Sequence, residues 1–240
     1  MVGVRSQVTS KRVRRLVSLF RKERLCPFCG WRGFRFQPFG KRVIYRADAS
    51  CPICGSLERH RAALLLLRNR IPKGQKVLHV APESLMIPWL VSLSREYLNI
   101  DLYNPAMVQM DLTQIDLPDQ SKTLIWCSHV LEHILDDGKA LSEVYRVLTP
   151  GGLFVAQVPI VGDITYEDAG VVDEEERLDK FLQEDHVRLY GRDLRQRIEK
   201  AGFDCEVLST ADMSPDEQRL YALRHPVFQE VFLCYRPLDA

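Results

Sequence analysis

Two short cysteine motifs carry the clearest chemistry in the sequence. Cys26-Pro-Phe-Cys29-Gly30 and Cys51-Pro-Ile-Cys54-Gly55 are two copies of one CPxCG unit, separated by 21 residues. Two C-x2-C turns that face each other supply the four thiolates of a tetrahedral Zn(II) site. Alternating residues and a turn at 38–40 predict a hairpin between them. We predict a closed, structural zinc ribbon with the ligands Cys26, Cys29, Cys51 and Cys54; a redox disulfide pair and an iron–sulfur site are the alternatives.

A second group of potential ligands lies in the sequence His129-Val-Leu-Glu132-His133. On a helix, positions i, i+3 and i+4 share one face, so these side chains would point the same way. With His186 as a further ligand they would hold a second divalent cation, a Lewis acid that lowers the pKa of an acceptor hydroxyl. Alternatively, His133, His186 or His129 is a catalytic base without a metal, or the group is structural. The sequence leaves these interpretations open.

The elements that must position these groups follow residue 74. The sequence predicts strands at 76–80, 97–100, 107–110, 122–126 and 153–158, and helices at 85–94, 129–148 and 189–201. This alternation is typical of a parallel sheet with helices on both faces. Strands at 205–208 and 231–235 are expected to pair as a hairpin, with the last strand antiparallel. We predict an α/β fold: a doubly wound, Rossmann-like, mostly parallel sheet preceded by the zinc ribbon.

Residues that directly follow the predicted strands are the candidates for ligand binding, because doubly wound sheets bind ligands at the carboxyl ends of their strands. Asp101 ends the second strand, and one carboxylate accepts hydrogen bonds from two ribose hydroxyls at once. Asp111 and Leu112 follow the third strand and offer an amine acceptor and an apolar wall for a purine. A single Asp after a strand is commonly a turn former, so the pair is more informative than either residue.

Four stretches together resemble the class I S-adenosylmethionine-dependent methyltransferases of the V-L-E-H and P-G-G type. They are VLHVAPE, YLNIDL, VQMDLTQIDLPDQSKTLIWCSHVLEHI and VLTPGGLFVAQVP, within residues 75–160. The resemblance implies an S-adenosylmethionine cofactor and transfer of its methyl group to an O or N. It also places a divalent-ion set, E-x-x-E-H in ubiquinone O-methyltransferases and small-RNA 2′-O-methyltransferases, at His129, Glu132 and His133. The implied cofactor-binding residues are His79, Ala81, Pro82, Glu83, Asp101, Leu102, Asp111, Leu112, Ser128 and His129.

The first loop departs from the family pattern. That loop is normally rich in glycine, which lets the backbone approach the methionine end of the cofactor, whereas this chain has His79-Val-Ala81-Pro82-Glu83. Pro82 lacks an N–H donor. We expect Glu83 to hold the ammonium group of the cofactor instead. The altered loop is also the only support for a third interpretation, a non-catalytic module that binds a cofactor or partner.

A long connection at 160–190 is expected to cover the acceptor site, because loops of this length in compact domains are commonly functional. Its candidate substrate contacts are Tyr166, Asp168, Arg188 and Tyr190. The many acids in this segment would repel phosphates. They favour a small-molecule acceptor over RNA.

Charge divides the 240 residues into unlike parts. Residues 1–73 carry 18 Lys and Arg against three acids, a net +15, and the remainder carries −14. We expect three units: a basic amphipathic helix at 1–24, the ribbon with a connecting helix at 25–73, and the methyltransferase domain at 74–240. The basic part would either dock RNA, as in rRNA guanine methyltransferases with an N-terminal zinc ribbon, or neutralise the acidic domain. Without an apolar run or a signal peptide, we expect a cytoplasmic protein with no membrane span; its oligomeric state is open.

Overall fold

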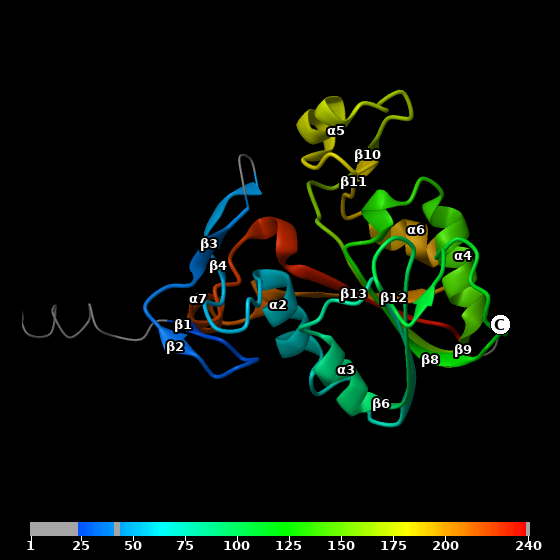
Figure 1. Ribbon diagram of the computed structural model, residues 1–240, viewed down its shortest axis with the longest axis horizontal. Coiled ribbons are helices and arrows are strands. Elements are labelled where there is room, and N and C mark those ends of the chain that lie inside the picture. The colour runs from blue at the N-terminus through cyan, green and yellow to red at the C-terminus, as the bar shows by residue number, and fades with distance from the viewer. Residues whose placement is uncertain (1–23, 41–43, 239–240) are drawn as a thin grey trace, which may run out of the picture.

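One seven-stranded sheet forms the centre of the molecule (Figure 1). The computed structural model describes residues 24–40 and 44–238. The strand order is β12-β13-β9-β8-β5-β6-β7. Every neighbouring pair is parallel except those of β13, which runs antiparallel to both β12 and β9. The predicted mostly parallel, Rossmann-like sheet is therefore confirmed. The strands are β5 (Gln75–Val80), β6 (Ser94–Asp101), β7 (Val108–Gln109), β8 (Lys122–Ser128), β9 (Leu148–Gln157), β12 (Asp204–Ser209) and β13 (Glu230–Tyr235).

Alternating side chains of the central strands enter two separate cores. On β8, Ile125 and Cys127 pack with α4 (Asp137–Val147) and α6 (Leu194–Lys200). Leu124 and Trp126 point the other way, toward α2 (Glu58–Leu67) and α3 (Ile87–Leu93). Because both faces are covered, the middle of β8 is a continuous apolar run, as is typical of buried parallel strands.

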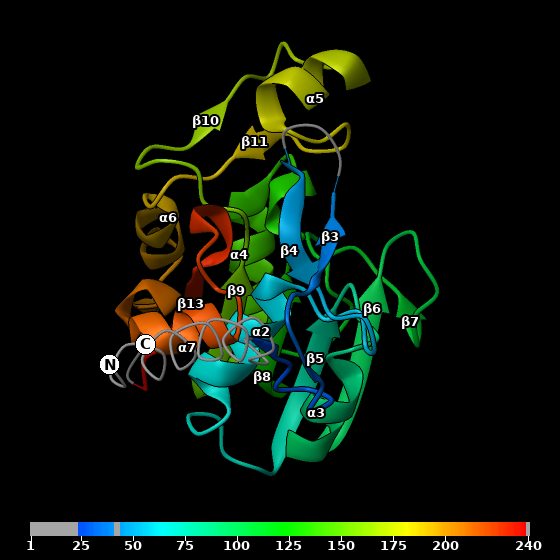
Figure 2. The ribbon, with the colours of Figure 1, turned by 90° about the vertical axis from the view of Figure 1, so that its left-hand side faces the viewer.

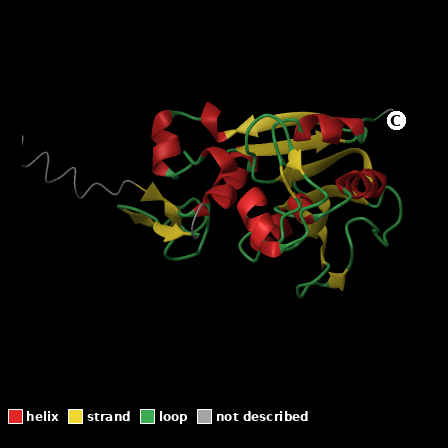
Figure 3. Cartoon of the chain, turned by 90° about the horizontal axis from the view of Figure 1, so that it is seen from above, coloured by secondary structure: helices red, strands yellow, loops and turns green. Residues whose placement is uncertain are grey.

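The cysteine turns lie in a small module beside the sheet, and Figure 3 shows its short strands apart from the large ones. β1 (Arg24–Leu25) pairs with β2 (Arg32–Gly33), and β3 (Gln37–Phe39) pairs with β4 (Arg46–Ser50). The predicted hairpin is present, but Phe39, expected in the turn, lies in β3. The predicted basic helix at 1–24 lies outside the described residues, except for Arg24 in β1.

Helix α2 connects the module to the sheet. Ala63 and Leu67 of this helix are fully buried in the same core as Val77 of β5 and Leu90 of α3. The module also lies against a segment that precedes β13 and comprises α7 (Pro215–Leu220) and η4 (Pro226–Phe228). The two units are therefore packed together through α2 and through the α7–η4 segment.

The predicted helix at 129–148 is wrong at its start. β8 extends to Ser128, His129 has a φ of 55°, and only a single 3-10 turn, η2 (Leu131–His133), follows. α4 begins at Asp137, because the Asp136 carboxylate accepts a hydrogen bond from the backbone N–H of Lys139 and caps a new helix. At its other end, α4 stops at Val147, and β9 begins earlier than the predicted 153.

The segment after β9 forms a separate layer over one end of the sheet. β10 (Tyr166–Glu167) pairs with β11 (Arg188–Leu189), and α5 (Glu174–Phe181) lies between them in sequence. Figure 2 shows β3 and β4 rising toward α5. The tail helix α6 starts at Leu194, later than the predicted 189, because Leu189 belongs to β11. In the described ranges, no helix has the length and apolar character needed to cross a bilayer.

Candidate active site

The carboxyl ends of three neighbouring strands bring the predicted cofactor residues together. In the parallel register, Val80 of β5 lies opposite Ile100 of β6 and Cys127 of β8. Ala81, Asp101 and Ser128 each come next in the chain, so they meet at one edge of the sheet. The Met110 N–H bonds to the Asp101 carbonyl at 3.0 Å, which brings the residues after β7 to the same edge.

His79 lies inside the sheet and is fully buried. Its Nδ1 lies 2.9 Å from the Tyr97 hydroxyl, whereas its Nε2 is buried without a hydrogen-bond partner among the described residues. Burial lowers the pKa of His79 to about 4, even though the nearby Glu83 carboxylate acts in the opposite direction. His79 is therefore neutral at pH 7.

The loop after β5 contains no glycine, and Ala81 makes its tight turn. Ala81 has a φ of 47°, an uncommon conformation for a residue with a Cβ, and its N–H donates to the Ile100 carbonyl at 2.8 Å. Glu83 then turns its carboxylate toward α2. Its Oε1 accepts from Arg59 Nε at 3.0 Å, Arg59 Nη2 at 2.9 Å and His60 Nε2 at 2.7 Å. Its Oε2 is buried and unpartnered among the described residues.

Opposing effects act on the Glu83 carboxyl. Burial alone would raise its pKa, but the hydrogen bond from His60 and the positive charge of Arg59 hold the pKa well below its usual range. Glu83 is thus an anion with one oxygen available to a donor from a ligand. An ammonium group is such a donor.

The Asp101 carboxylate holds the backbone of the loop that follows β6. Its Oδ1 accepts the backbone N–H groups of Tyr103 at 2.8 Å and Asn104 at 2.7 Å. Within the described residues, its Oδ2 has only the Asn104 side-chain amide, at 3.3 Å. Burial raises the pKa of this carboxyl, and the Asn104 and Tyr103 N–H groups lower it further than burial raises it. One oxygen of Asp101 therefore retains capacity for a ligand.

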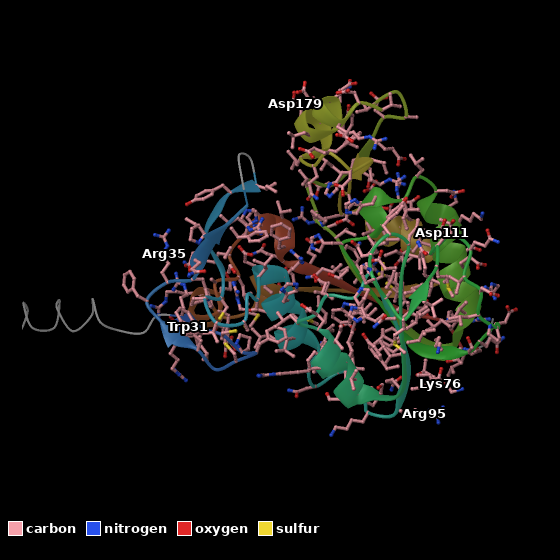
Figure 4. All side chains as sticks on the ribbon, in the orientation of Figure 1. Trp31, Arg35, Lys76, Arg95, Asp111 and Asp179 are labelled. Atoms are coloured by element: carbon pink, nitrogen blue, oxygen red, sulfur yellow. The ribbon has the colours of Figure 1, made fainter. Side chains whose placement is uncertain are left out.

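The predicted adenine residues differ in exposure. Asp111, labelled in Figure 4, accepts the Thr113 N–H at 2.7 Å and is partly exposed. Leu112 is buried in the core, whereas Leu102 is 37% exposed beside Asp101. Leu102 therefore offers the more accessible apolar surface at this edge.

The histidines and Glu132 converge although they do not share a helix. One ligand atom each from Glu132, His133 and His186 lies within 4.8 Å of the others. His129 Nδ1 lies 3.1 Å from Glu132 Oε1, and Glu132 Oε2 is buried without a partner among the described residues. Burial would raise the pKa of Glu132, but the pKa is lowered, with the neighbouring His129 as the main opposing group, so Glu132 is anionic.

The hydrogen bonds of two of these histidines define their tautomers. His186 Nδ1 lies 3.1 Å from the Phe181 carbonyl, and His133 Nδ1 lies 3.2 Å from the Asp185 carbonyl. A carbonyl only accepts, so each Nδ1 carries a proton, and a second proton or a metal on these rings would bind at Nε2. Burial lowers the pKa of His186, which favours its neutral form. Such nitrogens can accept a proton or bind a metal.

A cavity of about 1410 Å³ opens over this cluster. The ribbon supplies Phe39 and Ile44 to its wall, α2 supplies Arg59, and α5 contributes acidic side chains such as Asp179 (Figure 4). Its other lining residues are Gly40, His129, Glu132, His133, Glu174, Glu175, Leu178, Leu182, Gln183, Glu184, Asp185 and His186. The cavity is therefore bounded by the ribbon, by α2, by the segment after β8 and by the α5 region.

The four predicted substrate contacts do not line this cavity. Arg188 is 4% exposed, and its guanidinium donates to the carbonyls of Ile134 and Leu135. The hydroxyl of the buried Tyr190 donates to Asp137 at 2.7 Å. Tyr166 and Asp168 are exposed on and beside β10, where Asp168 lies 3.4 Å from Lys180. Arg188 and Tyr190 support the site by joining β11 to the η2 segment.

The four cysteines form a compact cluster, with their Sγ atoms within 4.8 Å of one another. The Cys26 and Cys54 sulfurs lie 3.5 Å apart, and those of Cys29 and Cys51 lie 3.7 Å apart. Zn–S bonds of about 2.3 Å in a tetrahedron place sulfurs roughly 3.8 Å apart. The donor set and its spacing therefore fit Zn(II).

The sequence did not predict Arg59 and His60 as site residues. Both lie in the helix that connects ribbon and sheet, and their contact with Glu83 spans 23 or 24 residues. No spacing motif relates them to the first loop. Phe39 and Ile44 of the ribbon were equally unexpected in a cavity wall.

Comparisons with known proteins agree with this architecture. The family model for a methyltransferase domain matches residues 65–156. A Mycolicibacterium smegmatis protein described as a probable S-adenosylmethionine-dependent methyltransferase is 33% identical over 97 residues, 40% of this chain and 34% of the relative. Dimethylglycine N-methyltransferase of Parasynechococcus marenigrum is 40% identical over 50 residues, 21% of this chain and 18% of the enzyme. The chain thus spans about a third or less of the length of these relatives.

Solved structures share the fold. The Burkholderia thailandensis 1,6-didemethyltoxoflavin-N1-methyltransferase, with 1,6-didemethyltoxoflavin and S-adenosylhomocysteine bound, is 14% identical, with a TM-score of 0.53 over 76% of this chain and 79% of that one. An S-adenosylmethionine-dependent methyltransferase from Archaeoglobus fulgidus is 13% identical, with a TM-score of 0.53 over 75% and 95%. Together these findings show a match to a methyltransferase-domain model over residues 65–156 and a fold shared with solved methyltransferases.

Proposed function

We propose that this chain, which contains a methyltransferase domain, transfers the methyl group of S-adenosylmethionine to an O or N of a small-molecule acceptor. The observation that carries the proposal is the incomplete hydrogen bonding at the sheet edge. Glu83 Oε2, Ser128 Oγ and His129 Nε2 are buried polar atoms without partners among the described residues. Such atoms are uncommon in a native protein, and a polar ligand would satisfy them.

Each part of the edge has a distinct role in this proposal. Asp101 Oδ2 holds the ribose hydroxyls, Asp111 and its neighbouring leucines flank the adenine, and Glu83 Oε2 accepts from the ammonium. His79, Ala81, Pro82, Ser128 and His129 surround the methionine part. When bound, S-adenosylmethionine supplies an electrophilic methyl group, so the protein needs mainly to align the acceptor and remove its proton.

We assign proton removal to the cluster of Glu132, His133 and His186. With its Nδ1 proton bonded to a carbonyl and its pKa lowered by burial, His186 has an Nε2 that suits a general base. Together with His133 and the Glu132 carboxylate, it also forms a set that imidazole-binding divalent metals accept, as the sequence indicated. Metal analysis separates the two: beyond the zinc of the four-cysteine site, a bound ion adds one equivalent, and Glu132→Gln removes that equivalent alone. A single equivalent in the wild type favours the metal-free base.

The walls of the cavity support a small acceptor. Apolar side chains of the ribbon face the acidic residues of α5 across it, and a negatively charged wall repels a polyphosphate. The four-cysteine site serves as structural zinc in this proposal, in keeping with a cytoplasmic location where thiols stay reduced. RNA is the alternative acceptor, supported by Arg32 and Arg35, which are exposed and form no ion pair within the described residues. Figure 4 labels Arg35 on the ribbon module.

Titration calorimetry with S-adenosylhomocysteine tests the cofactor assignment. Asp101→Asn keeps a carbonyl oxygen for the Tyr103 and Asn104 N–H groups but replaces the acceptor Oδ2 by a donor. We expect its affinity to fall at least about tenfold, since a hydrogen bond to a charged group contributes roughly 1.5–3 kcal/mol. Asp216→Asn, at an aspartate whose side chain is 88% exposed, is the matched control.

Two results would contradict the proposal. Wild-type protein that binds neither S-adenosylmethionine nor S-adenosylhomocysteine would leave only a non-catalytic module. Salt-sensitive binding of structured RNA, lost on charge reversal of Arg32 and Arg35, would instead favour the RNA acceptor.

A further inference from the structure

The first turn of α2 holds the loop that follows β5. Arg59 and His60 together place three donors on one oxygen of Glu83, at 2.7 to 3.0 Å. The backbone carbonyl of Arg59 also accepts from the Gln157 side chain at 3.3 Å, at the end of β9. The start of this helix is thus joined to two strand ends of the cofactor edge.

The hydrogen bonds of His60 define its role. Its Nδ1 accepts the backbone N–H of Leu57 at 3.0 Å, so the proton of the neutral ring lies on Nε2. Nε2 therefore donates to Glu83, and the ring connects the helix start to the loop. This contact requires α2 to begin where it does.

The same helix start is anchored to the cysteine turns. The Cys51 N–H bonds to the Ser56 carbonyl at 2.9 Å, and the Ser56 hydroxyl lies 3.2 Å from the Cys26 sulfur. Fully buried Arg61 donates to the carbonyls of Ala49 at 2.8 Å and Ser56 at 2.5 Å, on either side of the second turn. Its guanidinium also lies 4.0 Å from the centre of the Phe36 ring. A continuous chain of contacts thus runs from the cysteine turns through Ser56 and the first turn of α2 to Glu83.

We propose that α2 couples the four-cysteine site to the cofactor site, with Arg59 and His60 as positioning residues for Glu83. The inference rests on the proposed function and deepens it. In place of glycines, which would let the loop approach the cofactor, this chain orients one carboxylate from outside the sheet. With a metal bound, the four cysteines would hold the turn at 51–56; that turn positions the start of α2, and Arg59 and His60 of α2 position Glu83.

Such coupling is reciprocal, which provides its test. If zinc strengthens cofactor binding by some factor, the cofactor must strengthen zinc binding by the same factor. Zinc affinity is measured by competition with a chromogenic chelator, with and without saturating S-adenosylhomocysteine. Calorimetry gives S-adenosylhomocysteine affinity for the zinc-loaded and chelator-treated protein. We expect both ratios to agree and to lie at roughly 5- to 100-fold.

Arg59→Ala and His60→Ala separate coupling from folding. In zinc-loaded form, each should bind S-adenosylhomocysteine roughly tenfold or more weakly, while retaining wild-type zinc affinity in its absence and losing the reciprocal effect. Arg70→Ala is the matched control, because Arg70 follows the same helix but pairs with Glu206 at 2.9 Å on the exposed surface. It should leave both affinities unchanged.

The outcomes are distinct. Wild-type cofactor affinity in both variants, or a cofactor affinity that zinc removal does not change, overturns the inference while the proposed function stands. Wild-type protein that binds no S-adenosylhomocysteine overturns the proposed function and this inference with it.

Discussion

Buried polar side chains around the sheet edge differ in whether their hydrogen bonding is complete. Tyr190 and Arg188 have every strong donor occupied by protein acceptors, which marks them as supports. Glu83, Ser128 and Glu132 keep buried atoms without partners among the described residues. Since native proteins rarely leave such atoms unsatisfied, the open positions at this sheet edge make Glu83, Ser128 and Glu132 candidates for ligand contact.

His79 should make the stability of the protein depend on pH. Its pKa falls from about 6.5 in the unfolded chain to about 4 in the folded one, so its contribution is present above pH 6.5 and is lost as the pH falls toward 4. His79→Asn keeps a donor for Tyr97 but removes the titration. Between pH 6.5 and 4, the free energy of unfolding of the wild type should fall by about 3 kcal/mol more than that of the variant.

Urea unfolding at several pH values measures this difference. Tyr97→Phe is the control, because it removes the hydrogen bond to His79 and leaves the histidine able to titrate. That variant should keep the wild-type pH dependence. Parallel curves for wild type and His79→Asn would contradict the prediction, because they would show that folding does not change the pKa of this histidine.

Local spacing determined which site residues the sequence could predict. The four cysteines and the residues after each strand were predictable, because a C-x2-C turn and a strand end each place side chains within a few residues of chain. Arg59 and His60 were not, since their orientation toward Glu83 depends on how α2 packs on the sheet. The burial of Arg188 could not be predicted either, because its acceptors lie more than 50 residues away.

At the scale of elements, the strands were easier to predict than the segments that join them. Runs of apolar residues specify a strand whether its side chains enter one core or the other. The predicted strand positions match the observed strands to within a few residues, except for β9. The region after β8 was misjudged because the Asp136 cap restarts the helix and leaves His129 and η2 outside it. The histidine cluster still forms, because the loop before β11 brings His186 next to His133 of η2.

The β10–β11 layer should depend on Arg188. Arg188→Ala leaves the carbonyls of Leu131, Ile134 and Leu135 without this donor, and removes the partner of Glu167 at 3.0 Å. We expect the free energy of unfolding to fall by about 3 kcal/mol. Arg195→Ala breaks an exposed pair with Glu199 and should cost less than about 0.5 kcal/mol.

Chemical denaturation gives both values, and hydrogen exchange locates the effect. Amides of β11 and η2 should lose protection in Arg188→Ala, whereas those of β5 should keep it. An equal loss of stability in the two variants would contradict a supporting role for Arg188.

For the whole molecule, the opposite charges of the two units are partly compensated inside it. Arg59 pairs with Glu83 and Arg70 with Glu206, which joins the basic part of the chain to the acidic part. Arg46 pairs with Glu58 and Arg24 with Asp48 within the basic part itself. Arg32 and Arg35 remain exposed, so the described residues support both internal neutralisation and a polyanion surface of limited size.

The ribbon and the sheet should unfold as one unit, because α2 belongs to both. Fully buried Leu67 packs in the core that contains Val77 and Trp126. Leu67→Ala should lower the free energy of unfolding by about 2–5 kcal/mol and, in calorimetry of the zinc-loaded protein, shift a single transition. Ile53→Ala, at a residue 69% exposed on the second cysteine turn, should leave the transition in place. A separate ribbon transition with the same midpoint in Leu67→Ala would show that the units unfold independently, and would remove the structural basis for coupling the cysteine site to Glu83.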